Sequence, residues 1–275
     1  MLIYCKIKCA LAKCFGILMI RQYAVYLFIV LIFCGCSENN SPVKLVFKPL
    51  YNGQLIECDS NIKHQNQAWF VNQLQFFISQ VQLQNSQGTW QYLPLAKTIQ
   101  QTEHTALLGS TCQKEVVEHW QLNFKGEFDL ADFQAMRFSL GVPFEQNHLN
   151  PLQQPSPLND SSMFWVWQTG HKFLRLEMSS ESDDWLFHLG STGCTSQSVM
   201  RSPSDACLYP NLFQFELPLE SSNTVVFDLS KLIGELTLSM ATSCQSEHNS
   251  SACQTLFSRL NGSGEQAVFR VSVDD

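Results

Sequence analysis

Apolar and polar residues alternate in short runs along most of the chain, and turn-forming residues separate these runs. The run 74–83 (LQFFISQVQL) sets Phe76 and Ile78 against Gln75 and Ser79, as expected of a strand with two different faces. A Ser-Gln-Gly turn at 86–88 follows it, and its predicted hairpin partner is 90–93. Further strands are predicted at 43–47, 116–124, 136–140, 185–189, 212–217, 225–229 and 267–273. The run 163–178, broken at Thr169-Gly170, is predicted to form two strands or one bent strand.

Helical signals are few by comparison. One turn is predicted at 130–133, and short helices are predicted at 229–233 and 251–260. The run 147–162 is rich in Pro, Asn and Ser and is predicted to be a long surface loop, the kind of segment that often carries a binding site. Many short strands separated by turns predict an all-β, β-sandwich-like fold with long loops and few short helices.

The N-terminus has the pattern of an export signal. Residues 23–33 form a continuous apolar run behind Arg21, of a length typical of a signal peptide rather than of a membrane span. The run ends in FCGC (33–36), which resembles a bacterial lipoprotein cleavage box, so Cys36 is the predicted lipidation site. Met19 gives a more compact signal than Met1 and is a candidate true start.

These signals divide the chain into three parts. Residues 1–36 are the predicted lipoprotein signal peptide, 37–42 a flexible tether, and 43–275 one domain. The predicted protein is exported and held by a lipid anchor at the periplasmic side of a membrane, at the outer membrane or at the cell surface. An uncleaved signal anchor is the alternative.

Composition excludes one class of partner. The net charge is −7, the pI is near 5.5, and no basic run is present to neutralise phosphates, so nucleic acid is excluded as a ligand. The apolar content of 45% supports a real core, whereas the charged content of 15% lies below the usual value of about 25%.

Six cysteines follow Cys36, and an even number in an exported chain predicts disulfides. They are Cys58, Cys112, Cys194, Cys207, Cys244 and Cys253. Several connectivities are possible; neighbours flanking loops suggest Cys194–Cys207 and Cys244–Cys253, which leaves Cys58–Cys112. Thiolate metal ligands are the alternative, although none of the spacings is CxxC.

One aromatic-rich tract, 140–194, gathers the residues with the most chemistry. It contains Trp165, Trp167, Trp185, His148, His171 and His188. Neutral imidazoles suit copper or zinc, but the chain has no HExxH or HxH motif to support zinc hydrolysis. A lone His in a strand is more often a hydrogen-bonded core residue, and Trp at i and i+2 is more often core packing. The adjacent Asp183 and Asp184 are predicted to lie in a solvated turn.

A resemblance strengthens the metal hypothesis. The stretches LGVPFEQNH (140–148), PSPLN (155–159), MFWVWQTGHKFLRLE (163–177) and FHLGSTGC (187–194) occur in order, followed by Cys244 and Cys253. A weaker match is QLQFFISQVQL (73–83). In this combination, about 43–272 resembles the MbnP-like family of methanobactin-associated copper proteins, also called metallo-mystery pair system four-Cys motif proteins.

The resemblance implies both a metal and a partner. Members of the family are exported, β-rich proteins that bind copper. Their partner is a dihaem enzyme that resembles cytochrome c peroxidase and MauG and oxidises a Trp to kynurenine. Two His then hold Cu(I) near the modified residue. An indole can only donate a hydrogen bond, whereas kynurenine offers a nitrogen, which would explain Trp beside His.

Carried over to this sequence, the resemblance makes His148 and His188 the copper ligands. The candidates for the modified residue are Trp167 and Trp185, with Trp165 slightly less favoured. His171 stands where relatives usually have Tyr, and it is either a third ligand or a surface substitution. Met163 is a candidate soft neighbour of the metal.

The sequence therefore predicts an exported copper-binding lipoprotein that acquires, stores or hands over Cu(I) and is not an enzyme. A carbohydrate- or ligand-binding β-sandwich lipoprotein without metal is the first alternative, in which exposed Trp would stack on sugar faces. A catalytic copper protein with an open coordination position is the second.

Overall fold

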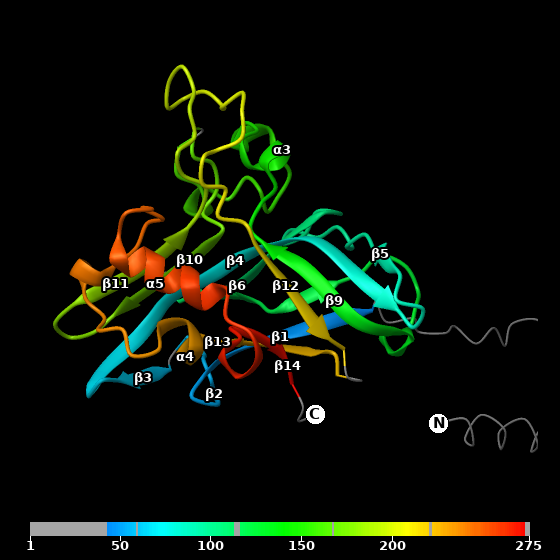
Figure 1. Ribbon diagram of the computed structural model, residues 1–275, viewed down its shortest axis with the longest axis horizontal. Coiled ribbons are helices and arrows are strands. Elements are labelled where there is room, and N and C mark those ends of the chain that lie inside the picture. The colour runs from blue at the N-terminus through cyan, green and yellow to red at the C-terminus, as the bar shows by residue number, and fades with distance from the viewer. Residues whose placement is uncertain (1–42, 59, 113–115, 167, 220–221, 273–275) are drawn as a thin grey trace, which may run out of the picture. The chain divides into compact units, whose positions relative to one another are not determined.

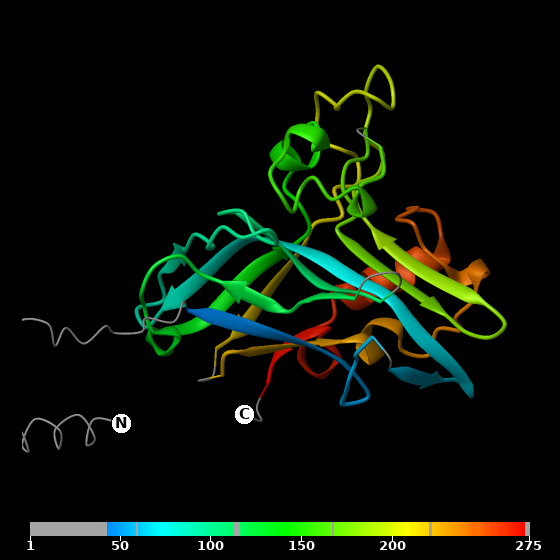
Figure 2. The same ribbon diagram turned by 180° about the vertical axis from the view of Figure 1, so that it is seen from behind.

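Two β-sheets packed face to face make up the part of the chain that the structure describes (Figures 1 and 2). The structure is a computed structural model and describes residues 43–58, 60–112, 116–166, 168–219 and 222–272. The predicted signal segment 1–36 and its lipidation site Cys36 lie outside the described residues.

The smaller sheet is built around β1 (Lys44–Tyr51). On one side β1 pairs in parallel with β13 (Thr224–Asp228), which pairs in turn with β14 (Phe269–Val271). On the other side it pairs antiparallel with β2 (Gln54–Leu55) and with β8 (Gln121–Asn123). First and last strands of the domain therefore meet in one sheet.

The larger sheet is built around β4 (Gln67–Asn85), a strand of 19 residues that crosses the view in Figure 1. Strands paired directly with it are β3 (Asn61–His64), β5 (Trp90–Tyr92), β6 (Thr105–Thr111), β9 (Phe133–Leu140) and β10 (Leu174–Ser179). Beyond these, β7 (Val117–His119) pairs with β6, β11 (Asp184–Leu189) with β10, and β12 (Phe213–Pro218) with β9.

Aromatic rings fill the space between the two sheets. Phe76 of β4 stacks on Phe227 of β13 with ring centroids 5.3 Å apart, and Phe138 of β9 meets Phe269 of β14 edge-on at 5.3 Å. Phe47 of β1 contacts three of these rings. Such pairs add to the hydrophobic free energy of burying the rings. The predicted all-β, sandwich-like fold is confirmed.

The predicted helical segments are confirmed as short elements at the edge of the core. They are the 3-10 turn η1 (Leu130–Asp132), α4 (Leu229–Ile233) and α5 (Ser251–Leu260). Asp228 caps α4 and Ser250 caps α5, since each side chain accepts a hydrogen bond from a backbone N–H of the first turn. The remaining short elements are α3 (Phe144–Asn147), η2 (Pro151–Gln153), η3 (Ser161–Met163), η4 (Met240–Thr242) and η5 (Gly264–Gln266).

Across the described ranges, every helix is too short or too polar to cross a membrane.

Two strand predictions were wrong in extent. The run 163–178 is not one strand, because η3 and an isolated bridge between Phe164 and His171 occupy its first half, and β10 begins only at Leu174. The run 116–124 splits into β7 and β8, which belong to different sheets. In contrast, β6 was not predicted, because nearly all its residues are buried and its sequence lacks alternation.

Three disulfides join the predicted pairs of cysteines, Cys58–Cys112, Cys194–Cys207 and Cys244–Cys253. Their sequence separations are 54, 13 and 9 residues. Each bond lowers the entropy of the unfolded chain and so stabilises the fold. Because all six sulfurs are bonded to one another, the alternative of thiolate metal ligands is excluded in this state.

Gly109 marks the closest approach of β6 to β4 and generates the first testable prediction. Its φ is +129°, and a Cβ added there would lie 2.0 Å from the backbone oxygen of Leu74. We expect Gly109→Ala to lower the free energy of unfolding by about 3 kcal/mol or more, because backbone strain and a clash with backbone add together.

Gly53→Ala is the matched control, since Gly53 also has a positive φ (+78°) but no atom near the added Cβ. Its cost should be only about 1–2 kcal/mol. Equal losses for both variants in chemical denaturation would contradict the proposed close packing of β4 and β6.

Candidate metal centre

A layer of buried and half-buried polar side chains lies on one face of β4, β10 and β11. In the strand register, Arg175 is opposite both His188 and Gln75, and Glu177 is opposite Gln73. Since side chains alternate across a strand, these five residues share one face, and the residues between them face the aromatic core. We call Gln73, Gln75, Arg175, Glu177 and His188 the polar layer.

A chain of charge-assisted hydrogen bonds orients His188 within this layer. Nε2 of His188 lies 2.8 Å from Oε1 of Glu177. Arg175 binds the same carboxylate in bidentate fashion, with Nε 2.7 Å from Oε1 and Nη2 3.0 Å from Oε2. Burial raises the pKa of Glu177, but the bonds from His188 and Arg175 outweigh it and lower the pKa to about 2.

The protonation states follow from these bonds. Glu177 is ionised at neutral pH and can only accept, so Nε2 of His188 carries the proton. Burial lowers the pKa of His188, although the bond to Glu177 opposes this, so the ring is neutral at pH 7. In a neutral ring with a proton on Nε2, the other nitrogen, Nδ1, holds an available lone pair.

Nδ1 of His188 is buried and has no hydrogen-bond partner. An unsatisfied buried polar atom costs about 1–3 kcal/mol, so a ligand at this position would relieve the cost. Ser79 Oγ and His119 Nε2 are also buried without partners among the described residues. Of the three atoms, Nδ1 of His188 has a tautomer fixed by a carboxylate, the arrangement typical of metal-binding histidines.

The segment from η3 to Trp165 covers the polar layer. The backbone oxygen of Ser162 accepts from Lys172 Nζ at 2.9 Å and from Arg175 Nη1 at 3.0 Å. Buried Met163 places its sulfur 4.0 Å from the Gln73 amide nitrogen. Met163 is therefore next to the polar layer, and its role as a soft neighbour of a metal stays a prediction.

Half-buried Trp165 lies beside His188, with ring centroids 6.5 Å apart and planes tilted by 50°. Its indole also packs on Gly190, where an added Cβ would lie only 2.4 Å from the ring atom Cζ3. A glycine is required at this position because any side chain would displace the indole. The structure thus brings one of the three predicted Trp candidates to one of the predicted ligands.

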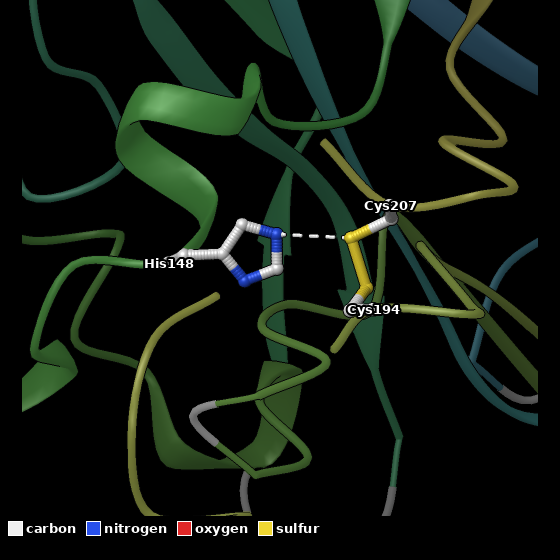
Figure 3. Close-up of side chains that lie close together, drawn as sticks. All are labelled: His148, Cys194 and Cys207. Atoms are coloured by element: carbon white, nitrogen blue, oxygen red, sulfur yellow. Dashed lines mark hydrogen bonds between the residues drawn. A yellow bond between two sulfur atoms is a disulfide. The ribbon is translucent and has the colours of Figure 1, made fainter. Parts of the chain in front are cut away.

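His148 is connected to the segment that follows β11 through its neighbour Asn147 and through the Cys194–Cys207 disulfide. It is buried at the end of α3, and its Nε2 lies 3.4 Å from Cys207 Sγ and 3.2 Å from Asn147 Nδ2 (Figure 3). Figure 3 shows the imidazole pointing at the Cys194–Cys207 disulfide. The Asn147 amide also lies 3.4 Å from Ser191 Oγ, which connects α3 to the strand end that carries His188.

Each predicted imidazole ligand therefore has its own set of neighbours, a disulfide for His148 and a carboxylate for His188. Both residues border the segment 188–194. Asn147 of α3 contacts Ser191, His148 contacts the disulfide of Cys194, and Trp165 packs on Gly190. Their joint coordination of one ion stays a prediction.

His171 is a core residue, so the expectation of a surface substitution was wrong. It is fully buried, with Nε2 2.9 Å from the Leu158 oxygen and Nδ1 3.2 Å from Asn147 Oδ1. Burial and the nearby His148 lower the pKa of His171. Because both ring nitrogens lie against protein oxygens, neither nitrogen of His171 is open to a metal in this arrangement.

Two Trp candidates remain to be placed. Trp185 is buried in the core and donates its Nε1–H to the Thr242 oxygen at 3.0 Å. It stands three residues before His188 in β11 and so faces the opposite side of the sheet. The preference for Trp185 over Trp165 therefore has no support in the geometry. Trp167 lies outside the described residues.

Two clusters of His, Cys and carboxylate atoms among the described residues are close enough to hold a metal. One is His148 with Cys194 and Cys207, and the other is Glu247 with Cys244 and Cys253. In both clusters the two sulfurs form a disulfide and offer no thiolate. Asp183 lies in the turn between β10 and β11, as predicted, and its carboxylate accepts from the N–H of Asp184 and Met240.

Three residues of the centre were not predicted from the sequence. Arg175 and Glu177 stand at i and i+2 in an otherwise apolar strand, a signal that a strand presents a charged pair on one face. Asn147 precedes His148, but a single Asn carries no comparable signal. Its buried amide accepts from the His171 N–H at 2.7 Å and thereby joins α3 to the loop before β10.

The carboxylate–imidazole pair generates a prediction that requires no metal. Replacing the carboxylate in Glu177→Leu removes the acceptor for Nε2–H, so the single tautomer of His188 should be lost. The free energy of unfolding should fall by about 1–3 kcal/mol, because polar groups of Arg175 and His188 lose their partner.

Nitrogen-15 NMR of histidine-labelled protein checks the tautomer, and thermal unfolding checks the stability. Glu181→Leu, in the exposed turn after β10, is the control and should change neither quantity. An Nε2–H tautomer that persists in Glu177→Leu would show that another group orients the ring.

Comparisons with known proteins identify the family and the fold of this chain. The family model MbnP matches residues 40–251, which is more than half of the chain. Among solved structures, MbnP from Methylosinus trichosporium superposes with a TM-score of 0.66 at 20% identity, covering 80% of this chain and 88% of that chain. A search of curated proteins gives no match. At 20% identity the structural match shows the fold, and the family model shows the membership: the chain belongs to the MbnP family.

Proposed function

We propose that the protein is an exported copper-binding protein that holds Cu(I) through His188 Nδ1, with His148 as the second imidazole ligand. Membership of the MbnP family suggests a methanobactin-related, copper-associated protein, and this supports copper as the metal. The observation that carries the proposal is the buried Nδ1 of His188, which has no hydrogen-bond partner among the described residues while Nε2 is fixed on Glu177.

The donor set suits a monovalent, soft-to-borderline ion. Neutral imidazoles are good ligands for copper, and a site poor in hard oxygen ligands disfavours Mg²⁺ and Ca²⁺. Glu177 does not have to bind the metal, because its role is to fix the tautomer and raise the basicity of Nδ1. The Met163 thioether beside the polar layer adds a soft neighbour.

His148 would have to exchange its present contacts to serve as a ligand. Its Nε2 lies within reach of the Asn147 amide N–H, which competes with a metal for the nitrogen lone pair. The Asn147 amide can give up this bond without losing all its partners, because Nδ2 also lies near the Thr169 oxygen and Ser191 Oγ. These two oxygens would accept the amide N–H that copper displaces from His148.

Trp165 is the residue we propose for oxidation to kynurenine by a dihaem partner enzyme. Two equivalents of hydrogen peroxide would each deliver one oxygen atom to the indole C2–C3 bond and leave as water, and this four-electron oxidation cleaves the bond and opens the five-membered ring. Hydrolysis of the resulting N-formyl group then releases formate. The product carries an aryl amine and a ketone in place of the indole. Beside His188, this group would offer a nitrogen or oxygen that the indole lacks.

The setting we propose is outside the cytoplasm, with a lipid on Cys36 as the anchor. The three disulfides support export, because disulfides persist in oxidising compartments. In this setting the protein would acquire, store or hand over copper and act as a substrate of its partner, not as a catalyst.

Copper titration of the purified exported chain tests the proposal. We expect uptake of a single Cu(I) per chain, and we expect His188→Ala to abolish it because the fixed donor atom is removed. Glu177→Leu should weaken binding by about 10- to 100-fold through the loss of ring orientation. Competition with a chromophoric Cu(I) chelator measures all three.

His104→Ala is the control, because His104 is exposed and stacks on Tyr92 of β5, which pairs with the opposite end of β4 from the polar layer. Its affinity should equal that of the parent chain. Retention of full Cu(I) affinity in a folded His188→Ala variant would refute this site.

Co-expression with the dihaem enzyme tests the modification. Intact mass should change by the gain of one oxygen atom and the loss of one carbon atom, and peptide mass spectrometry should place the change on Trp165. In Trp165→Phe the change should disappear, since the reacting indole is gone.

Trp90→Phe is the control. Trp90 lies in β5 beside Arg137, and it pairs with the opposite end of β4 from the polar layer, so the mass change should persist in this variant. The same change found on Trp167 or Trp185, with Trp165 intact, would contradict the assignment.

A further inference from the structure

A second polar hollow, separate from the metal centre, lies over the end of the larger sheet where β4 pairs with β5 and β9. Its volume is about 450 Å³, and its lining includes Gln80, Gln82, Tyr92, His104, Glu145 and Gln146. None of these residues belongs to the polar layer. The hollow therefore requires an explanation other than copper.

Three of the four glutamines that line the hollow, Gln80, Gln82 and Gln146, have one feature in common: each side-chain carbonyl oxygen already accepts a hydrogen bond from the protein. Gln80 Oε1 accepts from the Ser139 hydroxyl at 2.8 Å, and Gln146 Oε1 accepts from the Thr105 hydroxyl at 2.7 Å.

Gln82 Oε1 accepts from Arg137 Nη2 at 2.6 Å and from Nε at 3.1 Å. What these side chains still offer to a ligand is their NH₂ groups, two donors each.

An aromatic platform stands next to these donors. Tyr92 is 43% exposed and stacks on His104 with ring centroids 5.7 Å apart and planes 27° from parallel. The Tyr92 hydroxyl donates to the Glu103 oxygen at 2.7 Å, which fixes the ring in place. An exposed, immobilised ring face is suited to a flat apolar surface, and the C–H face of a sugar ring is such a surface.

Charge selects between two classes of acceptor-rich ligand. Convergent amide donors would suit an anion or a polyhydroxylated molecule. Glu145 places a carboxylate in the lining, and the chain carries a net charge of −7, so an anion would be repelled. The guanidinium of Arg137 binds Gln82 and lies over the Trp90 ring, and it is not among the lining residues, so the lining holds one carboxylate and no Arg or Lys. A neutral polyol can donate its hydroxyls to Glu145 and accept from the amides.

The backbone of β4 beneath the hollow contains a β-bulge at the residues that carry two of these amides. Pairing of β4 with β9 shifts register between Ser79 and Gln82, so two residues of β4 stand opposite the single residue Phe138. Gln80 within this bulge has a φ of +54°. A left-handed conformation costs a residue other than Gly about 1–2 kcal/mol, and such strain clusters at functional sites.

We propose that this hollow binds a neutral saccharide, with Tyr92 as the stacking platform and Gln80, Gln82 and Gln146 as hydrogen-bond donors. The volume accommodates a short segment of one or two sugar rings. The site is separate from the copper centre, and through it the protein would bind a glycan noncovalently.

Titration of the exported chain with a panel of neutral oligosaccharides tests the proposal. The probes are short gluco-, manno-, xylo- and N-acetylglucosamine oligomers, with an oligogalacturonate as the anionic comparison. We expect at least one neutral class to bind with a Kd of about 1 mM or tighter, as measured by calorimetry or ligand-observed NMR. Tyr92→Ala and Gln146→Glu should each weaken it by about tenfold.

Tyr209→Ala is the matched control, because Tyr209 also stacks on a histidine, His248, but on another part of the surface. It should leave saccharide affinity unchanged. Cu(I) binding should survive in Tyr92→Ala, which verifies the fold and separates this test from that of the copper site. Failure of every neutral saccharide to bind, tighter binding of the anionic oligomer, or equal affinity in Tyr92→Ala would overturn the proposal.

Discussion

Both edges of β4 are occupied along its length, and this single constraint organises the domain. A strand of 19 residues exposes backbone N–H and C=O groups on two sides, and five neighbouring strands satisfy them. Once those pairings are made, the two faces of β4 have separate fates. One presents Phe76 to the smaller sheet, and the other presents Gln73 and Gln75 to the polar layer. The position of the candidate metal centre is a consequence of that division.

Burial of a charged group costs hydration free energy, and hydrogen bonds within the polar layer offset this cost. Glu177 loses hydration on burial, but the bidentate bond from Arg175 and the bond from His188 compensate and keep it ionised. The ionised carboxylate then dictates which imidazole nitrogen holds the proton. The carboxylate thus fixes the tautomer of His188. Within the polar layer, the buried atom left without a partner among the described residues is Nδ1 of His188, whose lone pair a metal would use.

The sequence was sufficient for the parts of the molecule that local patterns determine. Alternation located most strands, short helical signals located α4 and α5, and the position of cysteines around loops located the three disulfides. It was insufficient where tertiary packing decides. Burial on both faces removed the alternation that would have indicated β6, and the hydrogen bonds of η3 replaced the predicted first half of 163–178. Burial of His171 also has no local signature, because a core histidine and a ligand look alike in one sequence.

The two proposed binding sites meet at α3, and the contacts of that short helix argue that they act separately. Gln146 lines the saccharide hollow, whereas His148, two residues later, faces the disulfide. Between them, Asn147 is fully buried and bound to the backbone of His171, with further contacts to Thr169 and Ser191. A displacement of Gln146 on saccharide binding would have to move Asn147 before it could change the position of His148. Coupling between sites needs an element with two alternative arrangements, and Asn147 holds α3 in one.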